Sequence, residues 1–536
     1  MATIKIRFKN LDLRFKKWIK ENKVEAIILL LILLIGSFFR LYKISEYMTF
    51  LGDEGRDVIV VKRLLTDFDP ILVGPGTSIG NMYLGPLYYY MMAPSLLLAN
   101  FSPVGPAVMV ALLGVAAIFL VWYIAREWFG KKAAVIASFL YAITPIVIIY
   151  SRSSWNPNIM PIFSLLTIYS IWQFWERKMY KWLIVAGIFM AFVLQSHYLG
   201  LLLAPVVGFF WILSLFRLRV TRFVLNIFKP TTRNALTDEQ NNFVRYSILG
   251  FLLFTLLMSP LVIFDARHEW RNFEAIKTFF MERQTTISAR PWTAFPKLKP
   301  LAEKISTRLV TGTDSKAGGR ALIGILLGIL WLITFNWRTL KGKEKKAYLL
   351  ISVWLIFALV GLGIYKQEIY DHYYGFFFAA PFLLVGGISQ GIVNNSKKTG
   401  LVVVVLILGW LSYINLANNP LKYTPNRQLQ RTTEVVKAVS KYSEGKAFNF
   451  AVIAERNYEG AYMYFFEMWG IPAYIPIADM LDETLKDQLF VVCEVTGERC
   501  NPETNERPEL ANFGWRKVVA SWEESGVTIH KVIHAQ

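Results

Sequence analysis

The chain has 536 residues, of which 54% are hydrophobic and only 18% are charged. Soluble domains carry about 25% charged residues, so this composition excludes an ordinary soluble protein and is typical of many membrane spans. The net charge of +20 does not indicate nucleic-acid binding. The basic residues lie in short loops between apolar runs, where they set topology and favour contact with anionic membrane lipid.

About eleven apolar segments are predicted to span the membrane, each near the roughly 20 residues that a span requires. They are 24–39, 103–125, 133–150, 158–175, 182–196, 198–216, 246–264, 321–336, 347–364, 374–391 and 400–417. The loops at one face are all basic: 1–23, 126–132, 176–181, 217–245, 337–346 and 394–399. The positive-inside rule assigns them to the cytoplasm. We therefore predict a multi-pass plasma-membrane protein with a cytoplasmic N-terminus and an extracytoplasmic C-terminus.

The chain divides into three parts: a basic cytoplasmic N-terminus (1–23), an all-α polytopic membrane domain (24–417) and a small α/β extracytoplasmic domain (418–536). In the last part, apolar runs predict strands at 448–454, 473–476, 488–495, 518–522 and 527–534, and helices at 432–440 and 458–469. Cys493 and Cys500 flank a turn in this domain. They form either a disulfide, which an extracytoplasmic location favours, or two unpaired thiols.

An acidic segment follows the first span. Gly52 to Asp57 contains three acids and Arg56 within six residues. A pair of carboxylates such as Asp53 and Glu54 can supply a general base and its partner. The alternative is that these acids cap a helix predicted over 57–68, whose apolar spacing indicates a helix lying in the membrane interface.

Further polar clusters lie at the predicted outer ends of the spans. Tyr88 and Tyr89 form either an interfacial aromatic belt or a wall for a substrate. Arg152 opposes the charge rule, which an anion partner (Asp53 or a bound phosphate) would explain, although a solvated loop arginine is the alternative. His197 sits in a tight turn, as a satisfied structural histidine or a functional one.

The long loop 265–320 carries an excess of basic residues on the predicted outer face. Planar arginine side chains such as Arg267 and Arg271 suit phosphate groups, although long loops partly escape the charge rule. Three of the five histidines (His197, His268 and His372) fall at outer span ends, without the spacing of a zinc motif.

The order and predicted side of these motifs resemble the C-type (GT-C) integral-membrane glycosyltransferases, especially the protein O-mannosyltransferases and the lipid A aminoarabinose transferases. The resemblance covers about residues 20–390. The matching residues are Arg40-Leu41, Asp53-Glu54, Gly85-Pro86-Leu87-Tyr88-Tyr89, Arg152 with Asn156-Pro157, His197 with Pro205, and His372-Tyr373-Tyr374 with Pro381.

The resemblance implies transfer of a sugar from a polyprenyl-phosphate carrier to a hydroxyl of a protein, lipid or glycan acceptor on the outer face. It implies that Asp53 is the general base and that Glu54 supports it. The donor phosphate would be held by Arg152, Arg267, Arg271 and His372. The substrates would be lined by Arg56, Tyr88, Tyr89, Asn156, His197, His268 and Tyr373.

One departure bears on cofactors. Relatives often carry an Asp between spans three and four, where this chain has Trp155-Asn156-Pro157-Asn158. No cofactor is therefore assigned, and a divalent metal is left open. Two alternatives from other classes are a secondary transporter, which would place charges near the midplane, and a non-catalytic protein that binds a polyprenyl lipid.

Overall fold

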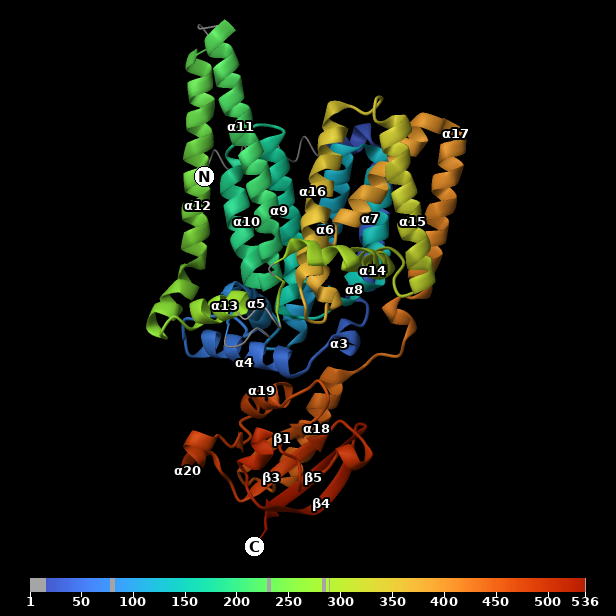
Figure 1. The fold of residues 1–536 in the computed structure, drawn as a ribbon. Helices are drawn as coiled ribbons and strands as arrows, with labels where there is room; N and C mark the ends of the chain where they lie inside the picture. Colours follow the sequence, from blue (N-terminus) through green and yellow to red (C-terminus); the bar gives the residue numbers. More distant parts are fainter. Residues whose placement is uncertain (1–15, 78–81, 229–232, 282–285, 289, 536) are drawn as a thin grey trace.

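A helical bundle and a small C-terminal α/β domain make up the molecule (Figure 1). The computed structural model describes residues 16–535 apart from 78–81, 229–232, 282–285 and 289. Most of the basic segment predicted to face the cytoplasm, residues 1–15, lies outside the described residues.

Every segment predicted to span the membrane is helical, but the predicted number of spans is not confirmed. Within the described residues, seven helices are long and apolar enough to cross a membrane. Three predicted spans correspond to helices of 13, 16 and 15 residues, α7, α9 and α10. The bundle helices are α2 (Lys23–Leu41), α6 (Val104–Trp128), α7 (Lys131–Ile143), α8 (Pro145–Ile149), α9 (Met160–Trp175), α10 (Trp182–Ser196), α11 (Ala204–Phe228), α12 (Arg233–Arg267), α15 (Ser315–Trp331), α16 (Gly342–Ile364) and α17 (Ala380–Ala417).

Two local breaks explain where the predicted spans differ from the observed helices. The predicted span 133–150 is interrupted at Thr144, which is extended (φ −68°, ψ 125°) because the following Pro145 disfavours the helical conformation of the residue before it. The last two predicted spans are joined in α17, and a kink at Ser396 and Lys397 (φ 33°) separates them.

A layer of short helices runs between the bundle and the C-terminal domain (Figure 1). It consists of α3 (Ile44–Tyr47), α4 (Gly52–Thr66), α5 (Leu87–Leu98) and α13 (Arg271–Met281), whereas α14 (Phe295–Ile305) lies against α15 and α16 of the bundle. The predicted interfacial helix is present as α4, but it begins at Gly52, five residues before the predicted start at residue 57. No helix is predicted for the region of α5, whose twelve residues are fewer than a membrane span requires.

The C-terminal domain contains a five-stranded sheet in the order β2-β1-β3-β5-β4. β1 pairs in parallel with β2 and β3, whereas β5 pairs antiparallel with β3 and β4. The predicted strands and both predicted helices are confirmed. The elements are α18 (Gln428–Tyr442), β1 (Phe448–Ile453), α19 (Gly460–Met468), β2 (Ala473–Tyr474), α20 (Leu481–Thr484), β3 (Gln488–Cys493), α21 (Pro508–Ala511), β4 (Arg516–Glu524) and β5 (Val527–His534).

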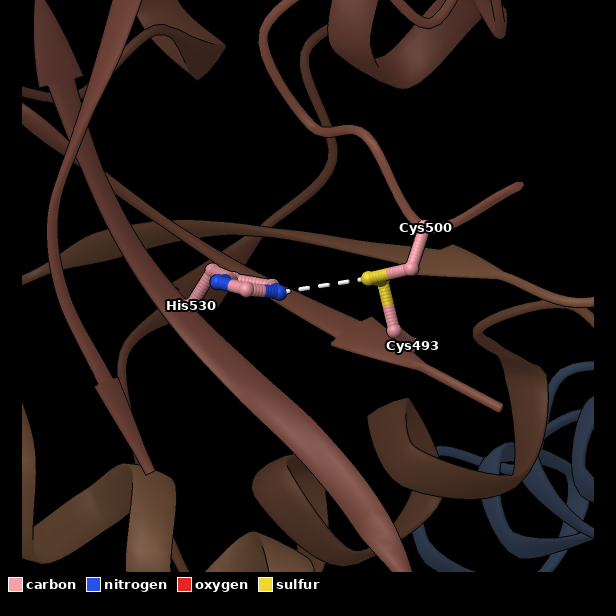
Figure 2. Close-up of side chains that lie close together, drawn as sticks. All are labelled: Cys493, Cys500 and His530. Carbon is pink, nitrogen blue, oxygen red and sulfur yellow. Dashed lines mark hydrogen bonds between the residues drawn. A yellow bond between two sulfur atoms is a disulfide. The ribbon is translucent and has the colours of Figure 1, made fainter. Parts of the chain in front are cut away.

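Cys493 and Cys500 form a disulfide at the end of β3. Figure 2 shows His530 of β5 beside it, with Nε2 3.2 Å from Cys500 Sγ, and Ser521 Oγ lies 2.8 Å from His530 Nδ1. Metal ligation by cysteine needs the thiolate. Because both sulfurs are bonded to each other, this cluster does not present a metal site in the oxidised protein.

Close backbone contact fixes the C-terminal domain on α4. A Cβ atom placed at Gly460 would lie 2.3 Å from the carbonyl oxygen of Gly52, and one at Gly55 would lie 2.2 Å from the Ala461 nitrogen. Further along the same helices, Glu467 accepts hydrogen bonds from Lys62 Nζ (2.9 Å) and Arg63 Nη2 (2.8 Å). The first turn of α4 is therefore held between the bundle and α19.

Candidate active site

The acidic segment forms the first turn of α4. Glu54 is buried, and one of its carboxylate oxygens accepts a 3.0 Å hydrogen bond from the Leu51 N–H. This is the contact by which a glutamate at the third helical position caps a helix. Burial raises the pKa of Glu54 to about 7, although the backbone hydrogen bond opposes the shift. The capping interpretation is confirmed for Glu54, and it makes this residue a structural support for Asp53.

The side chain of Asp53, unlike that of Glu54, is partly exposed to solvent. Its side chain is 42% exposed, and its Oδ1 accepts hydrogen bonds from Arg56 Nη1 (3.0 Å) and from the hydroxyl of Tyr458 (2.8 Å). Tyr458 belongs to the C-terminal domain, just before α19. Two donors thus fix the orientation of a carboxylate that solvent or a substrate can still reach.

Asp57, for which the sequence predicts no role in the site, is the third carboxylate of the segment. It is fully buried and accepts hydrogen bonds from Arg56 (Nη2, 2.8 Å) and from the Tyr89 hydroxyl (3.0 Å). Burial raises its pKa to about 6, and Arg56 opposes that shift. Arg56 therefore bridges Asp53 and Asp57, and Tyr89 links the pair to α5.

The neighbouring aromatic residues do not form an interfacial belt. Tyr88 and Tyr89 are buried at 0% and 3% exposure, and only Tyr90 is substantially exposed, at 44%. The Tyr88 hydroxyl lies 2.6 Å from Ser154 Oγ. Through Tyr89 and Tyr88, α5 thus connects Asp57 of α4 to Ser154 in the loop between α8 and α9.

Arg152 does not pair with Asp53, so that suggested partner is wrong. Its guanidinium instead donates to the carbonyl oxygens of Phe39 and Tyr42 (2.6 Å for the latter), and it lies 5.1 Å from the ring centre of Tyr47. Carbonyl oxygens at the end of the first span thus explain a buried arginine on this side. The predicted role of Arg152 at a donor phosphate is not supported by these contacts.

A second cluster of aromatic and imidazole rings lies next to the 151–158 loop. His197 and His372 are 5.5 Å apart between ring centres, and His197 lies 5.1 Å from Tyr373. The ring centres of His372 and Trp155 are 4.6 Å apart, with the rings tilted, and Asn156 donates to the carbonyl oxygen of Ser196 at 2.8 Å. Four of the predicted site residues are therefore brought together here.

Burial lowers the pKa of both imidazoles of this cluster. Burial lowers the pKa of His372 to about 4, although Asp371 opposes the shift. His197 is buried, and its Nδ1 accepts a hydrogen bond from the Leu199 N–H at 3.2 Å. His197 thus behaves as a satisfied structural histidine. The predicted role of His372 at a donor phosphate stays a prediction.

An ion pair between Arg308 and Asp371, which the sequence does not predict, lies next to His372 of this cluster. Arg308 binds Asp371 with both nitrogens of its fork, Nε at 3.0 Å and Nη2 at 2.6 Å. The two residues are 63 positions apart, and no local motif marks Arg308. Its charge is already matched by Asp371, so this pair stabilises the turn that carries His372.

Arg267, His268 and Arg271 lie at the junction of α12 and α13 and are all exposed. The His268 ring stacks on Phe264 at 4.0 Å. The guanidinium groups of Arg267 and Arg271 form no ion pair with another described residue. Their positive charges are therefore free to bind an anion at the layer of short helices, but no described contact joins them to Asp53. Their predicted role at a phosphate stays a prediction.

Comparison with known proteins adds an independent view of the fold. The family described as dolichyl-phosphate-mannose-protein mannosyltransferase matches residues 84–228. A putative mannosyltransferase of Bacillus subtilis (strain 168), YkcB, is 26% identical over 175 residues, which cover 31% of this chain and 23% of that protein. The chain thus matches about a quarter of the length of this curated relative.

Solved structures match nearly the whole chain. ArnT from Cupriavidus metallidurans, bound to undecaprenyl phosphate, aligns with a TM-score of 0.55 at 13% identity, covering 94% of this chain and 97% of ArnT. The chain has the GT-C fold. The oligosaccharyltransferase AglB from Archaeoglobus fulgidus aligns with a TM-score of 0.53 at 16% identity over 89% of this chain and 70% of AglB. This GT-C chain is therefore a multi-pass membrane protein that resembles mannosyltransferases and ArnT.

Proposed function

We propose that this GT-C protein is a glycosyltransferase that moves a sugar from a polyprenyl-phosphate carrier to an acceptor hydroxyl on the outer face of the plasma membrane. Asp53 carries the proposal. It is the only acid of the Gly52–Asp57 segment whose carboxylate remains accessible, and it lies on a helix at the level where a lipid-linked sugar and an acceptor from solvent would meet.

In the proposed reaction, the acceptor oxygen attacks the anomeric carbon of the sugar. The bond between that carbon and the phosphate oxygen breaks, and polyprenyl phosphate leaves with the bonding electron pair. Asp53 takes the acceptor's hydroxyl proton, as a positioned general base does. Attack from the face opposite the leaving phosphate inverts the anomeric centre.

The neighbours of Asp53 suit this role. Arg56 and Tyr458 hold the carboxylate in one orientation, and positioning of a reacting group is a large part of enzymatic rate enhancement. Cations placed where charge develops stabilise a departing phosphate. The exposed Arg267 and Arg271 are the candidates for this contact, because Arg152 and Arg308 are held by other partners.

We propose a reaction that does not require a divalent cation. The guanidinium of Arg56 already occupies the space between Asp53 and Asp57. Among the described residues, three potential ligands come together only at Cys493, Cys500 and His530, in the disulfide region. We therefore assign no step of the reaction to a metal.

The test uses the purified full-length protein in nanodiscs with a panel of polyprenyl-phosphate sugars and acceptor extracts. Released polyprenyl phosphate is measured by mass spectrometry for the wild type and for Asp53→Asn. We expect release from one donor and a loss of roughly 10²-fold or more in Asp53→Asn, the range that general-base catalysis contributes.

Asp67→Asn is the matched control, because Asp67 is an exposed acid at the other end of the same helix. It should retain wild-type release, and both variants should keep the wild-type melting temperature. Equal release by Asp53→Asn and the wild type would refute the role of Asp53. Binding of a donor without release by any variant would favour the non-catalytic lipid-binding alternative.

A further inference from the structure

A groove lies at the end of the bundle that is remote from the C-terminal domain. α2 and α17 both pack on α7, and between them they leave a cavity of about 640 Å³. α2 begins at this groove and ends at Leu41, next to the layer that carries the acidic segment. The groove is therefore on the opposite side of the membrane domain from Asp53.

The walls of the groove are apolar along its length. They are formed by three helices, with α2 supplying Ile28, α7 supplying Val135 and Ile136, and the part of α17 after the kink supplying Leu401, Val405 and Leu408. Several of these side chains are only partly covered by protein, although the surface they form lies within the membrane domain. Such a surface suits a hydrocarbon chain and not a soluble ligand.

The mouth of the groove is strongly basic. Lys20 lies just before α2 and Lys23 begins it, whereas Lys131 and Lys132 reach the groove from the start of α7. All four are exposed. Lysines that converge from two helices above an apolar cleft form the kind of basic pocket that binds lipid headgroups.

The two acids at the mouth do not cancel this charge. Glu25 is buried and accepts a 2.5 Å hydrogen bond from Arg126 Nε, with Lys131 Nζ 3.5 Å away. Glu21 faces Lys17 at 3.8 Å. Arg126 and Lys17 thus neutralise these carboxylates, and Lys20, Lys23 and Lys132 are left without an acidic partner among the described residues.

We infer that this groove binds one anionic phospholipid, with its phosphate among the lysines and an acyl chain along α7. Charge complementarity at the mouth and the apolar wall below it identify the same ligand. The site lies outside the candidate active site, and the inference does not depend on the proposed transferase activity.

The test is a titration of the delipidated protein in detergent with phosphatidylglycerol, read as lipid adducts by native mass spectrometry. Lys23→Gln with Lys132→Gln should weaken binding about thirtyfold, at roughly 1 kcal/mol for each lysine near a phosphate. Val405→Trp, which fills the apolar wall, should weaken binding by a similar factor. Phosphatidylcholine should bind the wild type more weakly than phosphatidylglycerol.

Two matched controls distinguish binding in the groove from general effects of lost positive charge and added side-chain volume. Lys343→Gln with Lys345→Gln removes the same charge from the start of α16, and Leu406→Trp adds the same ring next to Val405 but on an exposed surface outside the groove. Both should bind phosphatidylglycerol as the wild type does. The inference is wrong if the control pair loses as much affinity as the groove pair, if Val405→Trp retains full binding, or if the neutral lipid binds equally well.

Discussion

Asp53, Glu54 and Asp57 are close in sequence but differ in what surrounds their carboxylates. Glu54 caps α4 and Asp57 is buried beneath Arg56, whereas Asp53 remains accessible and receives the hydroxyl of Tyr458. Hydrogen bonds to a charged acceptor contribute about 1.5–3 kcal/mol. Tyr458 therefore acts on any reaction of Asp53 as a positioning residue.

Tyr458→Phe removes that hydroxyl and keeps the ring. We expect polyprenyl phosphate release to fall by about tenfold to hundredfold, the equivalent of one charged hydrogen bond. In the Asp53→Asn background the same change should cause no further loss of the residual rate, because a residue that acts only through Asp53 has nothing left to position.

Tyr474→Phe serves as the control, because Tyr474 is an exposed tyrosine of the same domain on β2. It should retain full activity. An equal loss from Tyr458→Phe in both the wild-type and the Asp53→Asn background would show that Tyr458 acts independently of Asp53.

Local sequence was enough to select Asp53 and Glu54, since acids that follow a span at the head of an amphipathic helix form a recognisable pattern. It could not select Tyr458, which lies 405 residues further along the chain. Asp57 could have been found, because it lies four residues after Asp53 on the same helix. The partners of Arg152 could not be predicted, because they are backbone carbonyl groups, which no sequence pattern reveals.

At the level of elements, the contact between α4 and α19 depends on glycine. Gly460 leaves no room for a side chain, because its Cβ position lies 2.3 Å from the Gly52 carbonyl oxygen. The backbone of one element therefore rests directly on that of the other, and this contact sets the distance between Tyr458 and Asp53.

Gly460→Val should displace α19 from α4 and reduce transfer activity about 10²-fold, the cost that a shift of about 1 Å can impose at an active site. The domain itself should remain folded with its disulfide formed. Limited proteolysis near 418–427 should become faster. Gly319→Val is the control, because it changes a helical glycine with open space around it. It should leave activity and proteolysis unchanged. Normal activity in Gly460→Val would contradict a role of the α4–α19 contact in positioning Tyr458.

Hydropathy predicted the long helices well, because burying apolar residues in lipid dominates their position. It did not predict α5, which packs against α4 and α6, buries Tyr88, Tyr89, Met92, Ala93 and Leu96, and leaves Leu97 and Leu98 exposed. The strands of the C-terminal domain followed from their apolar runs, and β1 and β3 are buried at every position. The position of the other elements depends on packing between segments that are remote in sequence.

At the scale of the whole molecule, the basic loops and the candidate site lie at opposite ends of the bundle. The positive-inside rule then predicts that the C-terminal domain is outside the cell. In a Cys493→Ser, Cys500→Ser background, Lys517→Cys should react with a membrane-impermeant maleimide in intact cells, whereas Lys343→Cys should react only after permeabilisation.

Both lysines are exposed, so differences in burial do not account for this expected contrast. Labelling of Lys343→Cys in intact cells, with protection of Lys517→Cys, would reverse the predicted orientation. The acceptor would then have to be cytoplasmic.

The hydrogen bond between Tyr458 and Asp53 also bears on how the protein is made. The ribosome synthesises Asp53 early and Tyr458 only after the whole helical bundle. Until the C-terminal domain has emerged, folded and docked on α4, the carboxylate lacks one of its two donors. A nascent chain already inserted in the bilayer would therefore hold an incomplete site, and competence for transfer would arise only at the end of biogenesis.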